Sequence, residues 1–198
     1  MSIMYHDGNR RLQDQFDSRR ISDRLEEKLT RTAFTSDDKA FIESAIYFFM
    51  STADADGRPD CSFKGGPPGF VRVTADSELA FPDYDGNGMF KSLGNVLVNP
   101  NVGLLFIDLH EKPRRLRVNG SAAVSRDDPL LESTTGAQMI VRVKARAIFP
   151  NCPRYIPKMQ LVENSVYVPQ PGCDPVEPAW KGFDIFNGYV HPRQPTAR

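Results

Sequence analysis

The feature that most constrains the fold of this chain is a succession of short strand-like segments without long helices between them. These segments are rich in β-branched and aromatic residues or alternate between apolar and polar residues. They cover residues 46–53, 60–64, 70–73, 78–81, 102–108, 116–124 and 138–149. Parallel βαβ units need a crossover of about a dozen residues, usually a helix, between strands. The pattern therefore predicts a mainly β (α+β) barrel or sandwich and not a doubly wound α/β fold.

Helical patterns are few and short. Residues 10–29 carry a narrow apolar stripe at helical spacing in a charged background, which predicts a helix that lies over a surface. The stripe consists of Leu12, Phe16, Ile21, Leu25 and Leu29. Thr35 or Ser36 is the predicted N-cap of a second helix, with Asp38 as the capping-box acid. A short amphipathic helix over 89–98 ends where an Asn-Pro pair follows.

The length of 198 residues fits one domain with appended segments. We expect an N-terminal helical segment over 1–35 and a barrel domain over 36–163. A proline-rich tail over 164–198 then wraps a surface or a neighbouring subunit. The 25 basic side chains balance 25 acidic ones, so the formal net charge is zero. This balance argues against binding to nucleic acid or to an anionic membrane through the overall field of the protein.

Two scarce residue types could form metal or redox sites. They are the cysteines Cys61, Cys152 and Cys173 and the histidines His6, His110 and His191. Their wide spacing predicts no disulfide scaffold and no metal site, and it favours loop positions for the histidines. The first twenty residues lack the apolar core of a signal peptide, and no apolar run is long enough to cross a membrane. We therefore predict a cytoplasmic protein with reduced thiols.

Two glycine-rich segments could bind a ligand. One strand ends in Lys64-Gly65-Gly66, where a flat ligand can approach the main chain beside a cation, although a simple turn with a solvated lysine has the same pattern. A strand, a glycine-rich loop and a helix start follow over residues 81–95. Backbone N–H groups there, with Lys91 and Ser92, can form a phosphate site, and each charge-assisted bond adds about 1.5–3 kcal/mol. The alternative is a capped surface helix.

Two further segments carry polar or basic side chains at strand ends. Asn151 and Arg154 can reach a cofactor or an anionic substrate, or Arg154 can pack in a turn on the end of the barrel. Cys152 between them has no evident base or cation to activate it, so we interpret it as structural or incidental. The basic run over 112–117 is better interpreted as the rim of an anion pocket than as a nucleic-acid patch, given the zero net charge.

The order of these pieces resembles the flavin-binding split β-barrel of the pyridoxamine 5′-phosphate oxidase-like family. The resemblance covers roughly residues 36–150 and is most specific in the block of loop, helix, Asn99-Pro100 and strand. The N-terminal helix and residues 151–155 are similar to those of a subgroup other than the vitamin B6 enzyme proper. That enzyme's C-terminal Arg-Leu-His-Asp-Arg motif has no match here, because Trp180 is followed at a different spacing by His191 and Arg193.

The resemblance implies a six-stranded split β-barrel with flanking short helices, and a homodimer with FMN at its interface. Lys91 and Ser92 would hold the FMN phosphate, with Asn87 nearby, while Phe63 and Lys64 would border the isoalloxazine ring. The full predicted cofactor-binding set is Phe63, Lys64, Gly65, Asn87, Lys91, Ser92, Arg115, Arg117, Asn151 and Arg154.

The predicted function is that of an FMN-dependent oxidoreductase. It would pass electrons through FMN between a reduced donor such as a nicotinamide and a small substrate or oxygen. No side chain is an evident general acid, so the sequence names no catalytic residue. The alternatives are a flavin-binding protein for storage or sensing, or a split barrel that uses the deazaflavin F420 or haem. No nucleic-acid or membrane partner is expected.

Overall fold

The structure is a computed structural model, and it describes residues 2–110 and 113–190. Two predictions fall partly outside these residues: the basic run that begins at Lys112 and the end of the proline-rich tail, which includes His191. The strands are β1 (Tyr47–Ala53), β2 (Pro59–Gly65), β3 (Arg72–Ala75), β4 (Glu78–Tyr84), β5 (Asn101–Asp108), β6 (Arg114–Ser125) and β7 (Ala137–Asn151). The helices are α1 (Asp7–Gln15), α2 (Arg19–Leu29), α3 (Ser36–Ser44) and α4 (Lys91–Val98), with short 3-10 turns η1 (Pro129–Leu131), η2 (Ala179–Gly182) and η3 (Asp184–Phe186).

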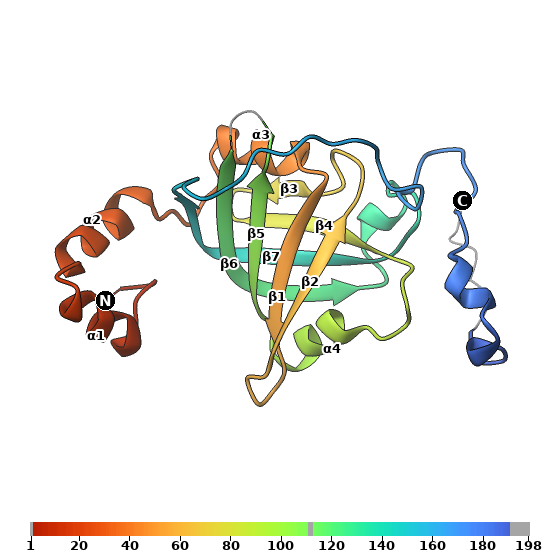
Figure 1. The fold of residues 1–198 in the computed structure, drawn as a ribbon, viewed down its shortest axis with the longest axis horizontal. Coiled ribbons are helices and arrows are strands. Elements are labelled where there is room, and N and C mark those ends of the chain that lie inside the picture. The colour runs from red at the N-terminus through yellow and green to blue at the C-terminus, as the bar shows by residue number, and fades with distance from the viewer. Residues whose placement is uncertain (1, 111–112, 191–198) are drawn as a thin grey trace.

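The strands form one antiparallel sheet in the order β2-β1-β5-β6-β7-β4-β3, which curls into a barrel left open between β2 and β3 (Figure 1). The prediction of a mainly β, α+β split barrel with short flanking helices is confirmed. The sheet has seven strands and not the six that the resemblance implies. The shortest strand, β3, has four residues and pairs with β4 at one edge of the sheet.

The core of the barrel is built from alternate residues of the central strands. Phe48 and Met50 of β1 are fully buried, and the ring of Phe48 contacts those of Phe81 and Phe106 at centroid distances of 4.9 and 5.0 Å. In β1 the intervening residues Tyr47, Phe49 and Ser51 lie on the other face of the strand, which is more exposed. Helices α3 and α4 lie at opposite ends of the barrel and not over the front face formed by β1, β2 and β5 (Figure 1). The strand alternation therefore separates a core face from an outer face that these helices leave uncovered.

A bulge in β6 requires a glycine. The β6–β7 register shifts between Asn119 and Gly120. A Cβ atom at Gly120 would lie 2.2 Å from the carbonyl oxygen of Lys144, a distance that no side chain can adopt. The close approach of two backbones explains why this strand carries a glycine in its interior.

The N-terminal segment differs from its prediction in two respects. The single helix expected over 10–29 is two helices, α1 and α2, because the chain turns at Asp17, which has a positive φ of 48°. The apolar stripe is also exposed, with Phe16 74% and Leu12 58% accessible. The helix pair projects from one side of the barrel (Figure 1). It is joined to the barrel by a backbone bridge between Arg31 and Ile148, with N–H···O distances of 2.9 and 2.8 Å.

The segment after β7 crosses the end of the barrel that carries α3 (Figure 1). The Met159 N–H donates to the carbonyl of Leu109 at 2.6 Å. Farther along, Lys181 forms an ion pair of 2.8 Å with Asp85, in the loop that precedes α4, and its side chain is only 9% exposed. This segment therefore contacts two distant loops of the barrel. No helix within 2–110 or 113–190 combines the length and apolar character that a membrane span requires.

Candidate functional site

The predicted cofactor residues lie on two faces of the sheet. In β2, Lys64 pairs with the buried Phe48 and lies on the core face, whereas Phe63 pairs with Phe49 and lies on the outer face. We call Lys64, Asn87, Lys91 and Ser92 the loop–helix group: the last three lie in the loop before α4 or at its start, and Lys64 lies on β2, the strand to which Ser92 is bonded. We call Phe63, Arg115, Arg117 and Asn151 the outer-face group. Gly65 ends β2 between the two groups, and Arg154 lies exposed beyond the end of β7.

In the loop–helix group, hydrogen bonds fix the start of α4 to β2. Ser92 is 6% exposed, and its Oγ donates to Asp60 Oδ2 at 2.7 Å and lies 3.0 Å from Ser62 Oγ. One turn later, the amide of Asn95 donates to Thr52 Oγ1 at 3.0 Å. Because the Ser92 hydroxyl hydrogen is committed to Asp60, the backbone N–H of Ser92 is the donor that remains for an anion at this position.

The N-terminus of α4 has no side-chain cap. Its N-cap residue, Phe90, is left-handed with φ 47°, whereas α1 and α3 each begin with a complete capping box. Lys91 is exposed at this end. Asn87 stabilises the loop by accepting the Met89 N–H at 3.0 Å. Uncapped N–H groups beside a cation are the chemistry that binds a phosphate.

Near the open edge of β2, the ammonium of Lys64 lies close to the half-buried carboxylate of Asp83. Burial raises the pKa of Asp83, while the Gln138 amide, which donates to it at 2.8 Å, and the nearby Lys64 ammonium partly oppose that rise. Lys64 therefore lies on the side of β2 that faces β4, away from the outer face. The core-face end of β2 is electrostatically mixed and not purely cationic.

The outer face carries a cluster of aromatic rings at the β1–β2 edge. Tyr47 and Phe63 stack with a centroid distance of 5.6 Å and an interplanar angle of 14°. Phe49 meets Phe63 edge to face at 5.9 Å. Phe63 is 62% exposed even though it is a large apolar side chain. An exposed flat surface of this kind is suited to contact with a planar ligand or with a second protein surface.

One row of residues across the outer face has unsatisfied polar atoms. Tyr47 is opposite Gly65, Arg115 is opposite Asn151, and the β1–β5 and β5–β6 registers bring Tyr47 and Arg115 level with Ile107 between them. Tyr47 Oη, Arg115 Nε and Asn151 Oδ1 are all buried without a hydrogen-bond partner in the part of the chain that the structure describes. Each such group costs about 1–3 kcal/mol. Unpaired atoms aligned in one row point to an absent polar partner.

The other two predicted arginines do not join this row. Arg117 lies two residues from Arg115 along the outer face and stacks over Phe149 at 6.0 Å. Arg154 is exposed beyond the end of β7, and Tyr155 beside it is 93% exposed with a positive φ of 70°. The three cysteines are free and exposed.

Sequence reasoning missed a group at the end of β5. His110, interpreted above as a loop histidine, has its Nδ1 2.8 Å from Asp108 Oδ1. Both residues line a pocket of about 300 Å³ together with Tyr47. The Asp-x-His spacing at a strand end was the available signal for the pair. The proximity of Tyr47, however, depends on the pairing of β1 with β5, which no local pattern reveals.

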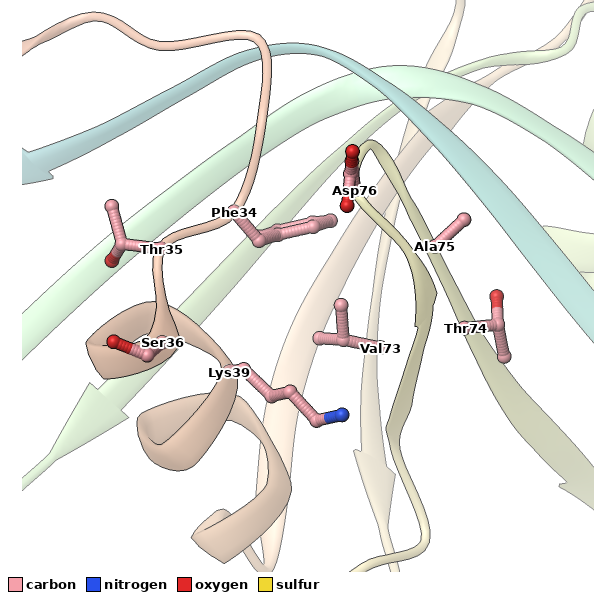
Figure 2. A pocket seen from close by; sticks show the side chains of 8 residues that line it. All are labelled: Phe34, Thr35, Ser36, Lys39, Val73, Thr74, Ala75 and Asp76. Atoms are coloured by element: carbon pink, nitrogen blue, oxygen red, sulfur yellow. The ribbon is translucent and has the colours of Figure 1, made fainter.

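A second pocket, of about 230 Å³, lies between the start of α3 and β3 (Figure 2). Figure 2 shows Phe34 and Lys39 extending from the α3 side toward Val73 and Asp76 of the β3 side. The hydroxyl of Thr35 is committed to the capping box of α3, and Lys39 lies 3.9 Å from Glu43. None of the predicted cofactor residues lines this pocket, so we do not assign it to the site.

Comparison with known proteins gives one sequence match and several similar folds. Residues 34–166, more than half of the chain, match the sequence model of the family described as pyridoxamine 5′-phosphate oxidase. No curated protein matches the chain.

Among solved structures, HupZ of Group A Streptococcus is 16% identical, covers 59% of this chain and 94% of its own, and has a TM-score of 0.47. HutZ, the haem storage protein of Vibrio cholerae, is 18% identical, covers 58% of this chain and 92% of its own, and has a TM-score of 0.43. An FMN-binding protein of Syntrophomonas wolfei is 13% identical, covers 71% of this chain and 97% of its own, and has a TM-score of 0.45. At these levels of similarity the structures identify no ligand for this chain.

Proposed function

The chain belongs to the pyridoxamine 5′-phosphate oxidase family, and from this premise we propose that it is a homodimeric FMN-dependent oxidoreductase. The observation that carries the proposal is the row of unpaired polar atoms on the outer face, at Arg115 and Asn151. A guanidinium N–H and an amide oxygen side by side match the alternating acceptors and donors along the pyrimidine edge of a flavin. These two residues therefore fit the cofactor that the family implies.

The loop–helix group fits the phosphate of the same cofactor. The uncapped N–H groups of α4 and the ammonium of Lys91 supply donors and positive charge. A Cβ atom placed on Gly86 or Gly88 would meet nothing within 4 Å, so the loop before α4 leaves room for a phosphate. Ser92 would contribute its backbone N–H, because its hydroxyl is held by Asp60. Asn87 would keep the loop in place through its bond to Met89.

The proposed dimer follows from the separation of the two groups. In one chain the loop–helix group belongs to the core side of β2, and the outer-face group belongs to the opposite side of the sheet. To contact both groups of the same chain, one FMN would have to pass around the edge strand β2. A second copy whose outer face meets the β2 edge of the first would bring one group from each chain to one FMN. The exposed Phe63 would then be buried at the interface.

The redox chemistry would be supplied by FMN when bound. The protein side chains would position and polarise it. Arg115 would place a positive charge at the pyrimidine edge, where a reduced flavin is negative, and Asn151 would accept a hydrogen bond there. Lys91 would hold the phosphate, and the aromatic cluster of Tyr47 and Phe63 would exclude water from the ring. A nicotinamide is the proposed electron donor, with a small molecule or oxygen as acceptor.

The visible absorption spectrum of the purified protein, with mass analysis of any released cofactor, tests this function. We expect flavin bands and a released mass equal to that of FMN. A colourless protein that ignores added FMN, or one with the Soret band of haem, would overturn the proposal. Oxidation of reduced nicotinamide under oxygen then separates an enzyme from a storage or sensing protein, because a bound flavin that no donor reduces would exclude the oxidoreductase.

A further inference from the structure

The pocket of about 300 Å³ lies where α3 ends, β1 begins and β5 ends. Its walls are mostly apolar and come from four segments, including the segment after β7, which contributes Leu161. The apolar lining consists of Phe41, Ala45, Ile46, Ile107 and Leu161. None of the residues in its lining belongs to the predicted cofactor set. The pocket is therefore distinct from the proposed flavin site except at Tyr47, whose ring also belongs to the aromatic cluster placed at the flavin.

The polar end of the pocket is formed by His110, whose backbone and ring are both hydrogen-bonded to Asp108. Asp108 Oδ1 accepts the backbone N–H of His110 at 2.9 Å and lies 2.8 Å from the ring Nδ1 of the same residue. With Nδ1–H donated to the carboxylate, the neutral ring leaves Nε2 as an acceptor. Ser44, which also lines the pocket, donates its hydroxyl to the carbonyl of Phe41 at 3.0 Å. Nε2 of the imidazole and the second carboxylate oxygen of Asp108 are thus the groups at this end that can accept from a ligand.

Tyr47 supplies a complementary donor. Its hydroxyl oxygen is buried and has no hydrogen-bond partner within the described residues. Burial, and to a smaller extent the negative charge of Asp108, raise the pKa of Tyr47, so the hydroxyl keeps its proton at neutral pH. The ring is held in place by stacking on Phe63. A buried O–H without an acceptor is satisfied when a bound molecule brings a lone pair.

We propose that this pocket binds a small neutral ring compound that carries a phenolic or enolic hydroxyl. The ligand oxygen accepts the hydrogen bond of Tyr47, and its own O–H donates to Nε2 of His110. Other chemical classes fit less well. A carboxylate or phosphate is repelled by Asp108. An ammonium group is attracted by Asp108 but has no lone pair, so it would leave the hydroxyl hydrogen of Tyr47 without an acceptor. Arg114, a cation that lies over the ring of the pocket residue Phe41, is paired with Asp37 at 2.7 Å.

The size and walls of the pocket limit the ligand to about one ring. A volume near 300 Å³ is at the lower end of the range for small-molecule sites. The apolar side chains around it favour an uncharged carbon skeleton. The hydroxyl selects among such compounds, because a ring without it would leave the buried Tyr47 Oη unpaired and would make no hydrogen bond to Nε2 of His110.

The probe for this proposal is 4-fluorophenol, followed by fluorine NMR during titration of the whole protein, with fluorobenzene as the compound that lacks the hydroxyl. We expect 4-fluorophenol to bind and fluorobenzene to bind at least several-fold more weakly. The substitution Tyr47→Phe removes only the oxygen and should weaken 4-fluorophenol by about 2- to 10-fold, the value of one neutral hydrogen bond. The matched control, Tyr167→Phe at an exposed position of the tail, should leave binding unchanged.

A second pair of variants tests the location of the ligand. Leu161→Trp should fill the pocket and abolish binding, whereas Val162→Trp, at the adjacent position that is 92% exposed, should not. Circular dichroism confirms that each variant is folded. The proposal is overturned if the two probes bind equally well, or if neither Tyr47→Phe nor Leu161→Trp changes the binding of 4-fluorophenol. Because the titration needs no flavin, its failure would not bear on the proposed FMN site.

Discussion

Around α4 the buried polar side chains are paired with one another, whereas across the outer face they are not. Ser92 is bonded to Asp60 and Asn95 to Thr52, so the side-chain hydrogen bonds that hold α4 against the sheet form within one chain. Arg115 Nε and Asn151 Oδ1, in contrast, are buried without partners among the residues that the structure describes. Both regions contain residues predicted to hold the same cofactor.

The difference shows that one region of a binding site can stabilise the fold while another is left to bind the ligand. Paired polar groups hold a helix in a fixed position before any ligand arrives, and so contribute to stability. Unpaired groups lower the stability of the free chain and become favourable only when a partner supplies the missing atoms. The α4 region should therefore respond to mutation mainly through folding, and the outer face mainly through binding.

The largest effect is expected from Asn95→Ala. The substitution leaves the hydroxyl of Thr52, which is 5% exposed, without its partner, so the free energy of unfolding should fall by about 1–3 kcal/mol. Urea denaturation measures the change. Replacing both partners, with Thr52→Val added, should recover part of the loss. An Asn95→Ala protein as stable as the wild type would mean that pairing does not hold α4.

The next largest effect is expected from Lys91→Ala, on the Kd for FMN. Loss of one charge-assisted contact of at least about 1.4 kcal/mol should raise the Kd for FMN by about tenfold or more, while the stability of the free protein changes by less than about 0.5 kcal/mol. Quenching of FMN fluorescence gives the Kd. Lys39→Ala removes the same charge from α3 and serves as the control. An unchanged Kd would show that the phosphate is not at α4.

Asp83→Asn should produce a smaller effect that depends on pH. Burial raises the folded-state pKa of Asp83 above its unfolded value, so the folded state holds the proton more firmly. Stability contributed by the protonated carboxyl is present below about pH 4 and is lost as the pH rises through the raised pKa. The stability of the variant relative to the wild type should therefore increase across that window and then level off. Urea unfolding at several pH values measures the difference in free energy of unfolding between the variant and the wild type. Asp76→Asn, at an exposed position, is the control. A difference that stays constant with pH would contradict the expectation.

The smallest expected change is in the stability of Arg115→Met. Because Arg115 Nε is buried without a partner, an apolar side chain of similar length should leave the free energy of unfolding within about 0.5 kcal/mol of the wild type, or raise it. The same variant should bind FMN more weakly. A loss of stability as large as that of Asn95→Ala would remove the contrast between the two regions.

Local signals predicted much of the fold. The capping box of Thr35 and Asp38 is present at the start of α3, and the helix predicted over 89–98 is found as α4. These features depend on neighbours within a few residues along the chain. The break between α1 and α2 was missed because it depends on a left-handed Asp17, a conformation that its residue type does not announce.

The site was predictable only in part, for a related reason. The glycine-rich loop and Lys91 are contiguous in sequence, so their association could be expected. The row that aligns Tyr47, Arg115 and Asn151 depends on strand register across four strands, from β1 through β5 and β6 to β7. The pocket at His110 has the same origin. Long-range register places side chains together, and no local pattern specifies it.

The position of β7 has a consequence for how the chain is made. It is the last strand in sequence, yet it lies between β6 and β4. Until residues 137–151 leave the ribosome, the hairpin of β3 and β4 has no neighbour on its second side, and the apolar side chains of Leu79 and Phe81 have no closed core to enter. At roughly 5–20 residues per second, that interval lasts several seconds. Closure of the barrel is therefore a late, long-range event, and the nascent chain is a candidate client for chaperones that cover unpaired strand edges.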